Sequence, residues 1–279
     1  MTESILVGVT GSAASRRAAA WAARRAYDRH ARIELISIVG GAVGAVGEGS
    51  VLDALLQSAR RTLDGVAENL RAGGLTVDTR IGRGDPVGEI VDASMLFDLL
   101  VIGGADRGRS AASDRYSHGP RIAAGAHCSV AVVPDVDIAS RHGVVVGVDG
   151  SVFSARALEF AAVEAARTGE KLTAITAWSP LPLPLGMHEY PPSYIDGMQR
   201  LARETLDDAV AGVTRLHTEL EVVRVVERGH PAAIIARHAE TARIVVVGSR
   251  GHGALARLLV GSTSQEVLDR LGAVAVVVR

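Results

Sequence analysis

Cysteine is nearly absent from this sequence, and its scarcity limits the sites that the chain can build. The 279 residues include a single cysteine, Cys128. One thiol excludes an intrachain disulfide and any metal site made from a cysteine cluster. A lone cysteine is also more often a small apolar core residue than a nucleophile, so we expect no catalytic role for Cys128.

Aromatic residues are few as well, and neither positive nor negative charge is in excess. Aromatics make up 3% of the chain and hydrophobic residues 48%, so the core must be built from Ala, Val, Leu and Ile, as in buried parallel sheets. The 30 basic residues oppose 31 acidic ones, which gives no long-range field toward nucleic acid or a membrane surface. A small-molecule or protein partner is favoured.

Long apolar runs are missing as well. Residues 1–4 lead directly into the short apolar run 5–9 without a basic leader, and no apolar stretch reaches about 20 residues. We therefore expect no membrane partner and a cytoplasmic location.

What the sequence does contain is a repeat. Residues 5–12 (ILVGVTGS) match residues 144–151 (VVVGVDGS) at an offset of 144 − 5 = 139, and residues 100–108 match residues 245–253 at an offset of 245 − 100 = 145. The second copy therefore carries a small insertion, expected in the proline-rich stretch 179–194. A chain about twice the usual domain size with this repeat predicts two domains, 1–137 and 143–279, with a linker near 135–143.

Continuously apolar strands alternate with amphipathic helices in both copies. The first copy is expected to form strands near 5–9, 33–39, 76–81, 99–103 and 129–133, and helices near 13–30, 51–72, 86–96 and 117–126. The second is expected to form strands near 144–148, 172–177, 221–227, 244–248 and 274–278, and helices near 152–168, 192–216, 231–241 and 262–271. Apolar strands of this kind need cover on both faces. The predicted class is α/β, with two tandem doubly wound parallel five-stranded sheets.

The segments after the first and fourth strands of the second copy form the candidate site, because the ligand crevice of an open parallel sheet lies where the strand order reverses. Asp149 follows the first strand, and a glycine-rich loop starts at Gly248. Glycines let the backbone approach an anion, and the helix expected after Gly261 offers N–H groups at its start. The hydroxyl groups of residues 262–264 add donors.

The spacing of these glycines resembles one particular family. Gly-Lys-Ser/Thr is absent, but G-x2-G-x9-G-(S/T) is present over Gly248, Gly251, Gly261 and Ser262. Together with VGVDGS and the segment RGHPAAII (228–235), this spacing is similar to that of the universal stress protein family. The resemblance covers essentially the whole chain.

The resemblance implies a fold, a ligand and a set of residues. The fold would be Rossmann-like, of the adenine nucleotide alpha-hydrolase type, and the ligand ATP, with or without Mg²⁺. In ATP-binding members the aspartate after strand one contacts the nucleoside, the residue ending strand two borders the adenine, and the glycine loop wraps the phosphates. The positions that carry over are Gly147, Val148, Asp149, Ala177, Val247, Gly248, Arg250, Gly251, Gly253, Gly261, Ser262, Thr263 and Ser264.

The first copy departs from this pattern. Thr10 replaces the aspartate, Asp106 stands in place of Gly251, and Tyr116 stands in place of Gly261. A carboxylate would repel phosphate, and a tyrosine would obstruct close approach of the backbone. We therefore expect weak or absent ATP binding in the first half.

Three functions follow from these observations. The leading interpretation is an ATP-binding stress or signalling module that acts on a protein partner. The alternatives are a slow ATPase and a nucleotide-independent interaction module. Family resemblance also implies that the last strands, 129–133 and 274–278, pair within the chain as a pseudo-dimer, and that tandem chains form a homodimer.

Overall fold

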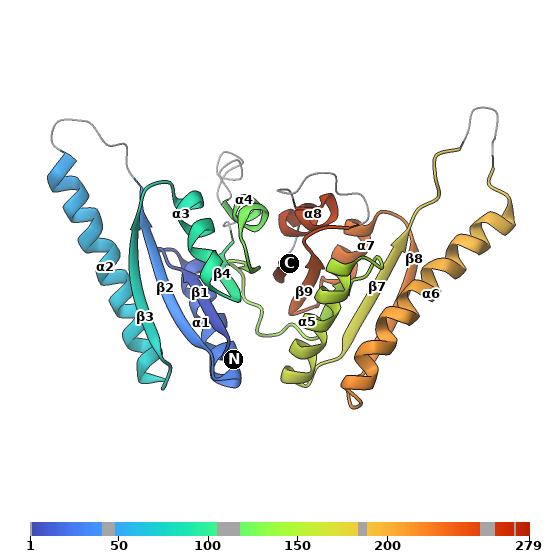
Figure 1. Cartoon of the computed structure of the whole chain (residues 1–279), viewed down its shortest axis with the longest axis horizontal. Coiled ribbons are helices and arrows are strands. Elements are labelled where there is room, and N and C mark those ends of the chain that lie inside the picture. Colours follow the sequence, from blue (N-terminus) through green and yellow to red (C-terminus); the bar gives the residue numbers. More distant parts are fainter. Residues whose placement is uncertain (1, 41–47, 105–117, 184–188, 252–259, 271) are drawn as a thin grey trace. The chain divides into compact units, whose positions relative to one another are not determined.

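The chain folds into two compact units, residues 1–137 and 138–279, in a computed structural model (Figure 1). The structure describes residues 2–40, 48–104, 118–183, 189–251, 260–270 and 272–279. Asp106, Tyr116 and Gly253, which the sequence analysis singled out, lie outside these ranges.

The first unit alternates strands and helices along the chain. Its elements are β1 (Ser4–Gly8), α1 (Ala13–Arg29), β2 (Arg32–Val39), α2 (Glu48–Ala72), β3 (Val77–Arg83), α3 (Pro86–Ala93), the 3₁₀ turn η1 (Ser94–Leu96), β4 (Leu99–Gly103), α4 (His118–Gly125) and β5 (Ser129–Val133). The strands pair in parallel in the order β3-β2-β1-β4-β5.

The second unit repeats this plan. Its elements are β6 (Val144–Gly147), α5 (Val152–Thr168), β7 (Leu172–Trp178), α6 (Pro192–Leu216), β8 (Val222–Arg228), α7 (Pro231–His238), β9 (Ile244–Gly248), α8 (Ser262–Arg270) and β10 (Val274–Val278). The parallel order is β8-β7-β6-β9-β10. The predicted class, two doubly wound parallel five-stranded sheets, is confirmed.

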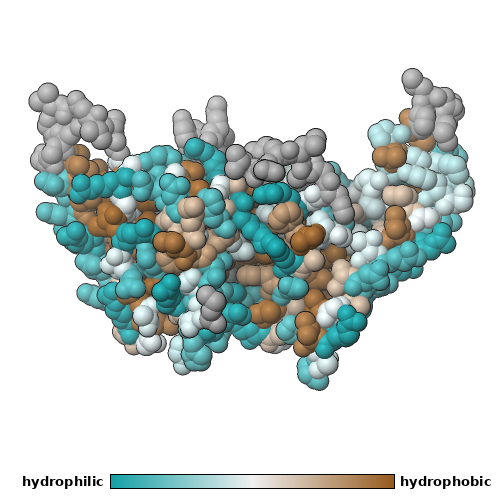
Figure 2. All heavy atoms as spheres, in the orientation of Figure 1, coloured by the Kyte–Doolittle hydropathy of each residue, from teal (hydrophilic) through white to brown (hydrophobic). Residues whose placement is uncertain are grey.

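Aliphatic side chains fill the core of each unit. In the first unit α1 packs against α2, and α3 against α4, as the two helical layers of a doubly wound sheet; α5 with α6 and α7 with α8 repeat this in the second. All residues of β9 and β10 are buried, as strands covered on both faces must be. On the visible surface, apolar patches are interspersed among hydrophilic ones (Figure 2).

The two repeats use the same local signals to start and end their first helix. The hydroxyl of Ser12 accepts a hydrogen bond from the backbone N–H of Ser15, and that of Ser151 accepts one from Ser154, at 3.1 Å in both cases. These are N-caps, which satisfy donors that the helix leaves open. The helices end on left-handed residues, His30 with φ +52° and Gly169 with φ +66°.

One predicted helix is divided in the structure. Residues 86–96 were expected to form a single helix, but α3 ends at Ala93 and a 3₁₀ turn follows. The hydroxyl of Ser94 donates to the carbonyl of Val91 at 2.6 Å and accepts from the N–H of His127 at 2.8 Å. This side chain competes with the regular helix pattern and turns the chain toward β4.

Candidate functional site

Asp149 lies at the carboxyl end of the second sheet, two residues after Gly147, the last residue of β6. The N–H of Val148 donates to the carbonyl of Ile175 at 2.8 Å, and the hydroxyl of Thr176 donates to the carbonyl of Val148 at 3.0 Å. Gly150 then turns the chain with φ +83°. The Asp149 side chain is exposed, so a carboxylate stands at the point where the strand order reverses.

One carboxylate oxygen of Asp149 is held by the turn that it begins. Its Oδ1 accepts a hydrogen bond from the N–H of Ser151 at 2.9 Å, in the manner of an Asx turn. The position of the carboxylate is therefore fixed by the same residue that caps α5.

The glycine loop after β9 returns to this carboxylate. A Cβ atom added to Gly251 would overlap Oδ2 of Asp149, so the backbone of residue 251 lies directly against the side chain. Only glycine allows this approach without displacement. The two segments that the sequence assigned to one crevice therefore meet in the fold.

Hydrogen bonds close the two ends of the loop onto each other. The N–H of Gly261 donates to the carbonyl of Ser249 at 2.8 Å, and the N–H of Ser249 donates to the carbonyl of Val278 at 2.7 Å. The hydroxyl of Ser264 donates to the carbonyl of Gly248 at 2.6 Å. The loop is thus anchored to both β10 and α8 at its base.

Helix α8 starts at this anchored base. The N–H of Gln265 donates to the carbonyl of Gly261 at 3.0 Å, which makes Gly261 the residue before the first turn. The N–H groups of the first turn have no partner inside a helix and carry its partial positive charge. Ser262 is exposed and Thr263 half-buried, so both lie where an anion at the helix start could meet them.

The hydroxyl of Ser264 has a role that the sequence analysis did not foresee. It was expected to face a phosphate, but it is buried and bonded to the carbonyl of Gly248. Its contribution is to hold the loop in place, because a hydroxyl has only one hydrogen to donate.

Packing explains two of the predicted site glycines, Gly147 and Gly248, but not Gly261. A Cβ at Gly147 would lie 2.9 Å from Cδ1 of Ile235, and one at Gly248 would lie 2.8 Å from the carbonyl carbon of Phe153. These glycines allow helices to pack closely on the sheet. At Gly261 the nearest atom to such a Cβ would be Cα of Arg250 at 3.6 Å, an ordinary contact.

Three other predicted residues lie at or just after the carboxyl ends of β7 and β9. Ala177 is half-buried near the end of β7, opposite Glu227 of β8. Val247 is 3% exposed and belongs to the core. The guanidinium carbon of Arg250 lies 5.1 Å from the ring centroid of Phe153, a stacking distance that keeps Arg250 at the first turn of α5.

Ser249 is a candidate that the sequence analysis missed. It is 1% exposed, and its hydroxyl finds no hydrogen-bond partner within the described ranges. A buried polar group without a partner is rare and calls for an explanation. Its position directly after an apolar strand was the signal available in the sequence.

A charged cluster fixes the end of β8 beside Ala177. His238 Nε2 lies 2.7 Å from Glu227 Oε1, and Arg237 pairs with the other oxygen. The hydrogen bond with His238, followed by that from Arg237, lowers the pKa of Glu227 below its ordinary value of 4.5. The cluster joins α7 to the strand that faces Ala177.

We expect Glu227→Gln to reduce the free energy of unfolding at pH 7 by less than about 1 kcal/mol, because partly exposed ion pairs contribute little. A carboxylate whose pKa is lowered by folding stabilises above its unfolded pKa, and this stability is lost as pH falls through the lowered value. The difference between wild type and variant should therefore shrink below pH 4.5. Urea unfolding at a series of pH values measures it. An undiminished difference in strong acid would contradict this account.

Known proteins agree with the repeat and with the fold. The model of the universal stress protein family matches residues 1–134 and again residues 141–279. The chain belongs to the universal stress protein family. A universal stress protein of Mycobacterium tuberculosis is 33% identical over 276 residues, which cover 94% of this chain and 92% of the relative. One from Mycolicibacterium smegmatis is 32% identical and covers 99% and 96%.

A solved structure extends this similarity to the whole fold. The universal stress protein from Archaeoglobus fulgidus superposes with a TM-score of 0.74 at 22% identity, over 99% of this chain and 96% of its own. The two matches of the family model confirm the predicted family and its tandem arrangement. Among the helices that the structure describes, none combines the length and apolar character needed to span a bilayer.

Proposed function

We propose that the second unit of this universal stress protein binds ATP and that bound nucleotide alters how the chain meets a protein partner. The observation that carries the proposal is the meeting of Asp149 with the backbone of Gly251. It brings a carboxylate, a glycine loop and the start of α8 to one edge of the sheet. A nucleoside and its phosphates need these complementary groups side by side.

The residues present fit such a ligand. A carboxylate can accept several hydrogen bonds, so Asp149 can accept from ribose hydroxyls as well as from the N–H of Ser151. The small side chain of Ala177 would leave room for a flat base. The N–H groups of Ser262 and Thr263 at the start of α8 would serve the phosphates. Arg250, held against Phe153, would add positive charge.

Two further features of the loop support a ligand there. Neither crowding nor a positive φ requires glycine at position 261, so the absence of a side chain suits the close approach of something else. The buried Ser249 hydroxyl lacks a partner among the residues that the structure describes, which makes it a donor within the loop base. Both features lie between β9 and α8.

Magnesium would be held mainly by the nucleotide. Within the described ranges, no group of three or more His, Cys, Asp or Glu side chains is placed to hold a metal ion. Mg²⁺ commonly binds through substrate phosphates, one or two carboxylates and water. Asp149 is a carboxylate at this edge of the sheet.

The proposal is tested by what the purified protein carries and binds. We expect heat-released small molecules to include ATP by mass spectrometry. In calorimetric titration, Asp149→Ala should weaken ATP binding at least tenfold. Thr10→Ala, at the matching position of the first unit, is the control and should change affinity less than twofold. A wild-type protein that neither carries nor binds ATP would refute the proposal.

Turnover and assembly are separate parts of the proposal. Bound ATP without multiple-turnover phosphate release would support a sensor, whereas release well above that of a loop variant would support a slow ATPase. We also propose that the protein acts in the cytoplasm as a homodimer of tandem chains. Sedimentation equilibrium with and without ATP measures the assembly state.

A further inference from the structure

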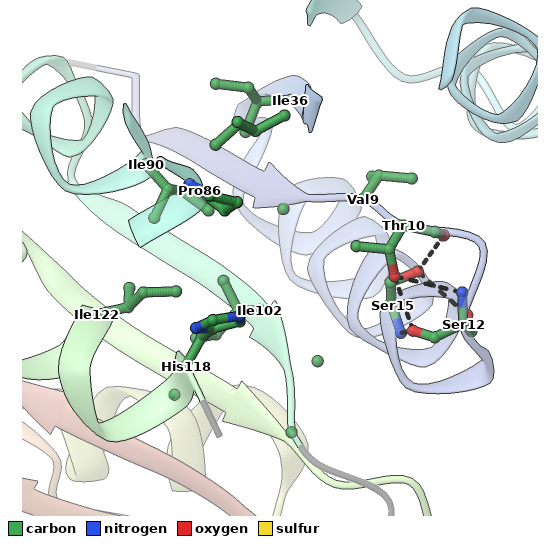
Figure 3. Close-up of a pocket in the computed structure, with 15 residues that line it drawn as sticks. Val9, Thr10, Ser12, Ser15, Ile36, Pro86, Ile90, Ile102, His118 and Ile122 are labelled. Carbon is green, nitrogen blue, oxygen red and sulfur yellow. Dashed lines mark hydrogen bonds between the residues drawn. The ribbon is translucent and has the colours of Figure 1, made fainter. Parts of the chain in front are cut away.

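The first unit contains a cavity of about 270 Å³ at the carboxyl ends of β1 and β4. Figure 3 shows its lining, with Thr10, Ser12 and Ser15 gathered on one side and most of the apolar residues on the other. Isoleucines dominate the apolar side. They are Ile36, Ile38, Ile90, Ile102 and Ile122.

The polar side of the cavity is small and mostly engaged in its own hydrogen bonds. The hydroxyls of Thr10 and Ser12 lie 2.9 Å apart, and the hydroxyl of Ser15 donates to the carbonyl of Thr10 at 2.5 Å. Among the described lining residues, only His118 has a titratable side chain. The described lining therefore offers no permanently charged side chain to offset the desolvation of a charged ligand.

The same positions in the second unit have a different character. Gly8 pairs with Ile36 as Gly147 pairs with Ile175, so Ile38 occupies the place of Ala177. Thr10 similarly replaces Asp149. Each change brings a larger apolar group or removes a charge.

The change extends to the loop base and the following helix. At the offset of 248 − 103 = 145 found for the fourth strands, Gly104 occupies the place of Ser249, and His118 that of Thr263. The N–H of Gly104 donates to the carbonyl of Val133 at 2.7 Å. The first unit therefore keeps the crevice while changing the groups that line it.

We propose that this cavity binds a compact, uncharged, largely apolar molecule with a single hydrogen-bonding group. The aliphatic walls suit an apolar body, and the Thr10–Ser12 hydroxyl pair or the His118 ring suits one polar atom. The volume is just below the usual range of about 300–1,000 Å³ for ligand pockets, which limits the ligand to a small ring system. The inference is independent of ATP binding in the second unit.

A matched pair of probes tests the charge preference on the full chain. We expect 1-naphthol to bind at least tenfold more tightly than 1-naphthyl phosphate, measured by ligand-observed NMR titration. The phosphate has the same ring and would be favoured if the start of α4 acted as an anion site. Equal or tighter binding of the phosphate, or no naphthol binding at millimolar concentration, would overturn the proposal.

Matched substitutions in the two units test the location. Ile38→Trp fills the cavity and should weaken naphthol binding at least tenfold without changing ATP affinity. Ala177→Trp should leave naphthol binding unchanged. If Ile38→Trp fails to fold, isoleucine methyl spectra of the wild type decide instead. Naphthol should shift Ile36, Ile90 and Ile102 but not Ile175, Ile234 or Ile235, and the reverse pattern would place the probe elsewhere.

Discussion

Gly261→Tyr is expected to weaken ATP binding by at least 100-fold, which corresponds to about 2.7 kcal/mol of binding free energy. The β-carbon of the new side chain finds space, because the nearest atoms are Cα of Arg250 at 3.6 Å and the carbonyl oxygen of Ser249 at 3.7 Å. The ring must then extend from the residue that precedes α8, where we propose the phosphates bind. Calorimetric titration with ATP measures the loss.

The control for this substitution is Gly261→Ala. It adds only the β-carbon, so it should keep the stability and lose far less ATP affinity than Gly261→Tyr. Both variants should unfold within a few degrees of the wild type. Unchanged ATP affinity in Gly261→Tyr, with the fold intact, would show that the phosphates do not lie against this residue. Loss of binding through unfolding would be visible in the melting curve.

Gly248→Ala is expected to destabilise the second unit by about 2–3 kcal/mol, because overpacking a dense core forces neighbouring atoms to move. Its β-carbon would lie 2.8 Å from the carbonyl carbon and 2.9 Å from the carbonyl oxygen of Phe153. These are backbone atoms of α5 and cannot rotate away. The urea concentration at the midpoint of unfolding should fall, while the m value should stay the same.

Tryptophan fluorescence can measure the destabilisation of the second unit by itself. The chain has two tryptophans, Trp21 in α1 and Trp178 in β7. In a Trp21→Phe background, Trp178 therefore follows the second unit. Gly261→Ala serves again as the matched control, since it places a β-carbon in the same loop without a close contact. An equal midpoint for Gly248→Ala and this control would show that α5 moves at little cost.

The two halves of this universal stress protein differ at the places that would decide what each binds. In the second unit a carboxylate contacts a glycine loop. In the first unit an isoleucine-lined cavity lies at the corresponding edge of the sheet. The sequence predicts weak or absent ATP binding in the first half. We propose that the cavity there takes an uncharged, apolar ligand instead.

The sequence was sufficient for the fold because the relevant signals are local. Apolar strands such as 244–248 and 274–278, alternating with amphipathic helices, require a covered parallel sheet, and the bounds of these two strands agree with β9 and β10. The repeat also indicated two copies of one fold. The rule for open parallel sheets also predicted that Asp149 and the loop after Gly248 would lie at the same edge of the sheet.

Only the tertiary structure could assign the parts played by individual loop residues. One glycine spacing includes Gly248, needed for packing on Phe153, Gly251, which lies against the Asp149 carboxylate, and Gly261, which packing does not require. The hydrogen bond of Ser264 to Gly248 was likewise hidden. Such differences depend on distances between segments far apart in the chain, which periodicity and composition do not encode. The sequence alone predicted that Asp149 and the Gly248 loop would lie at one edge of the sheet, and only packing decided which loop atoms are engaged within the protein.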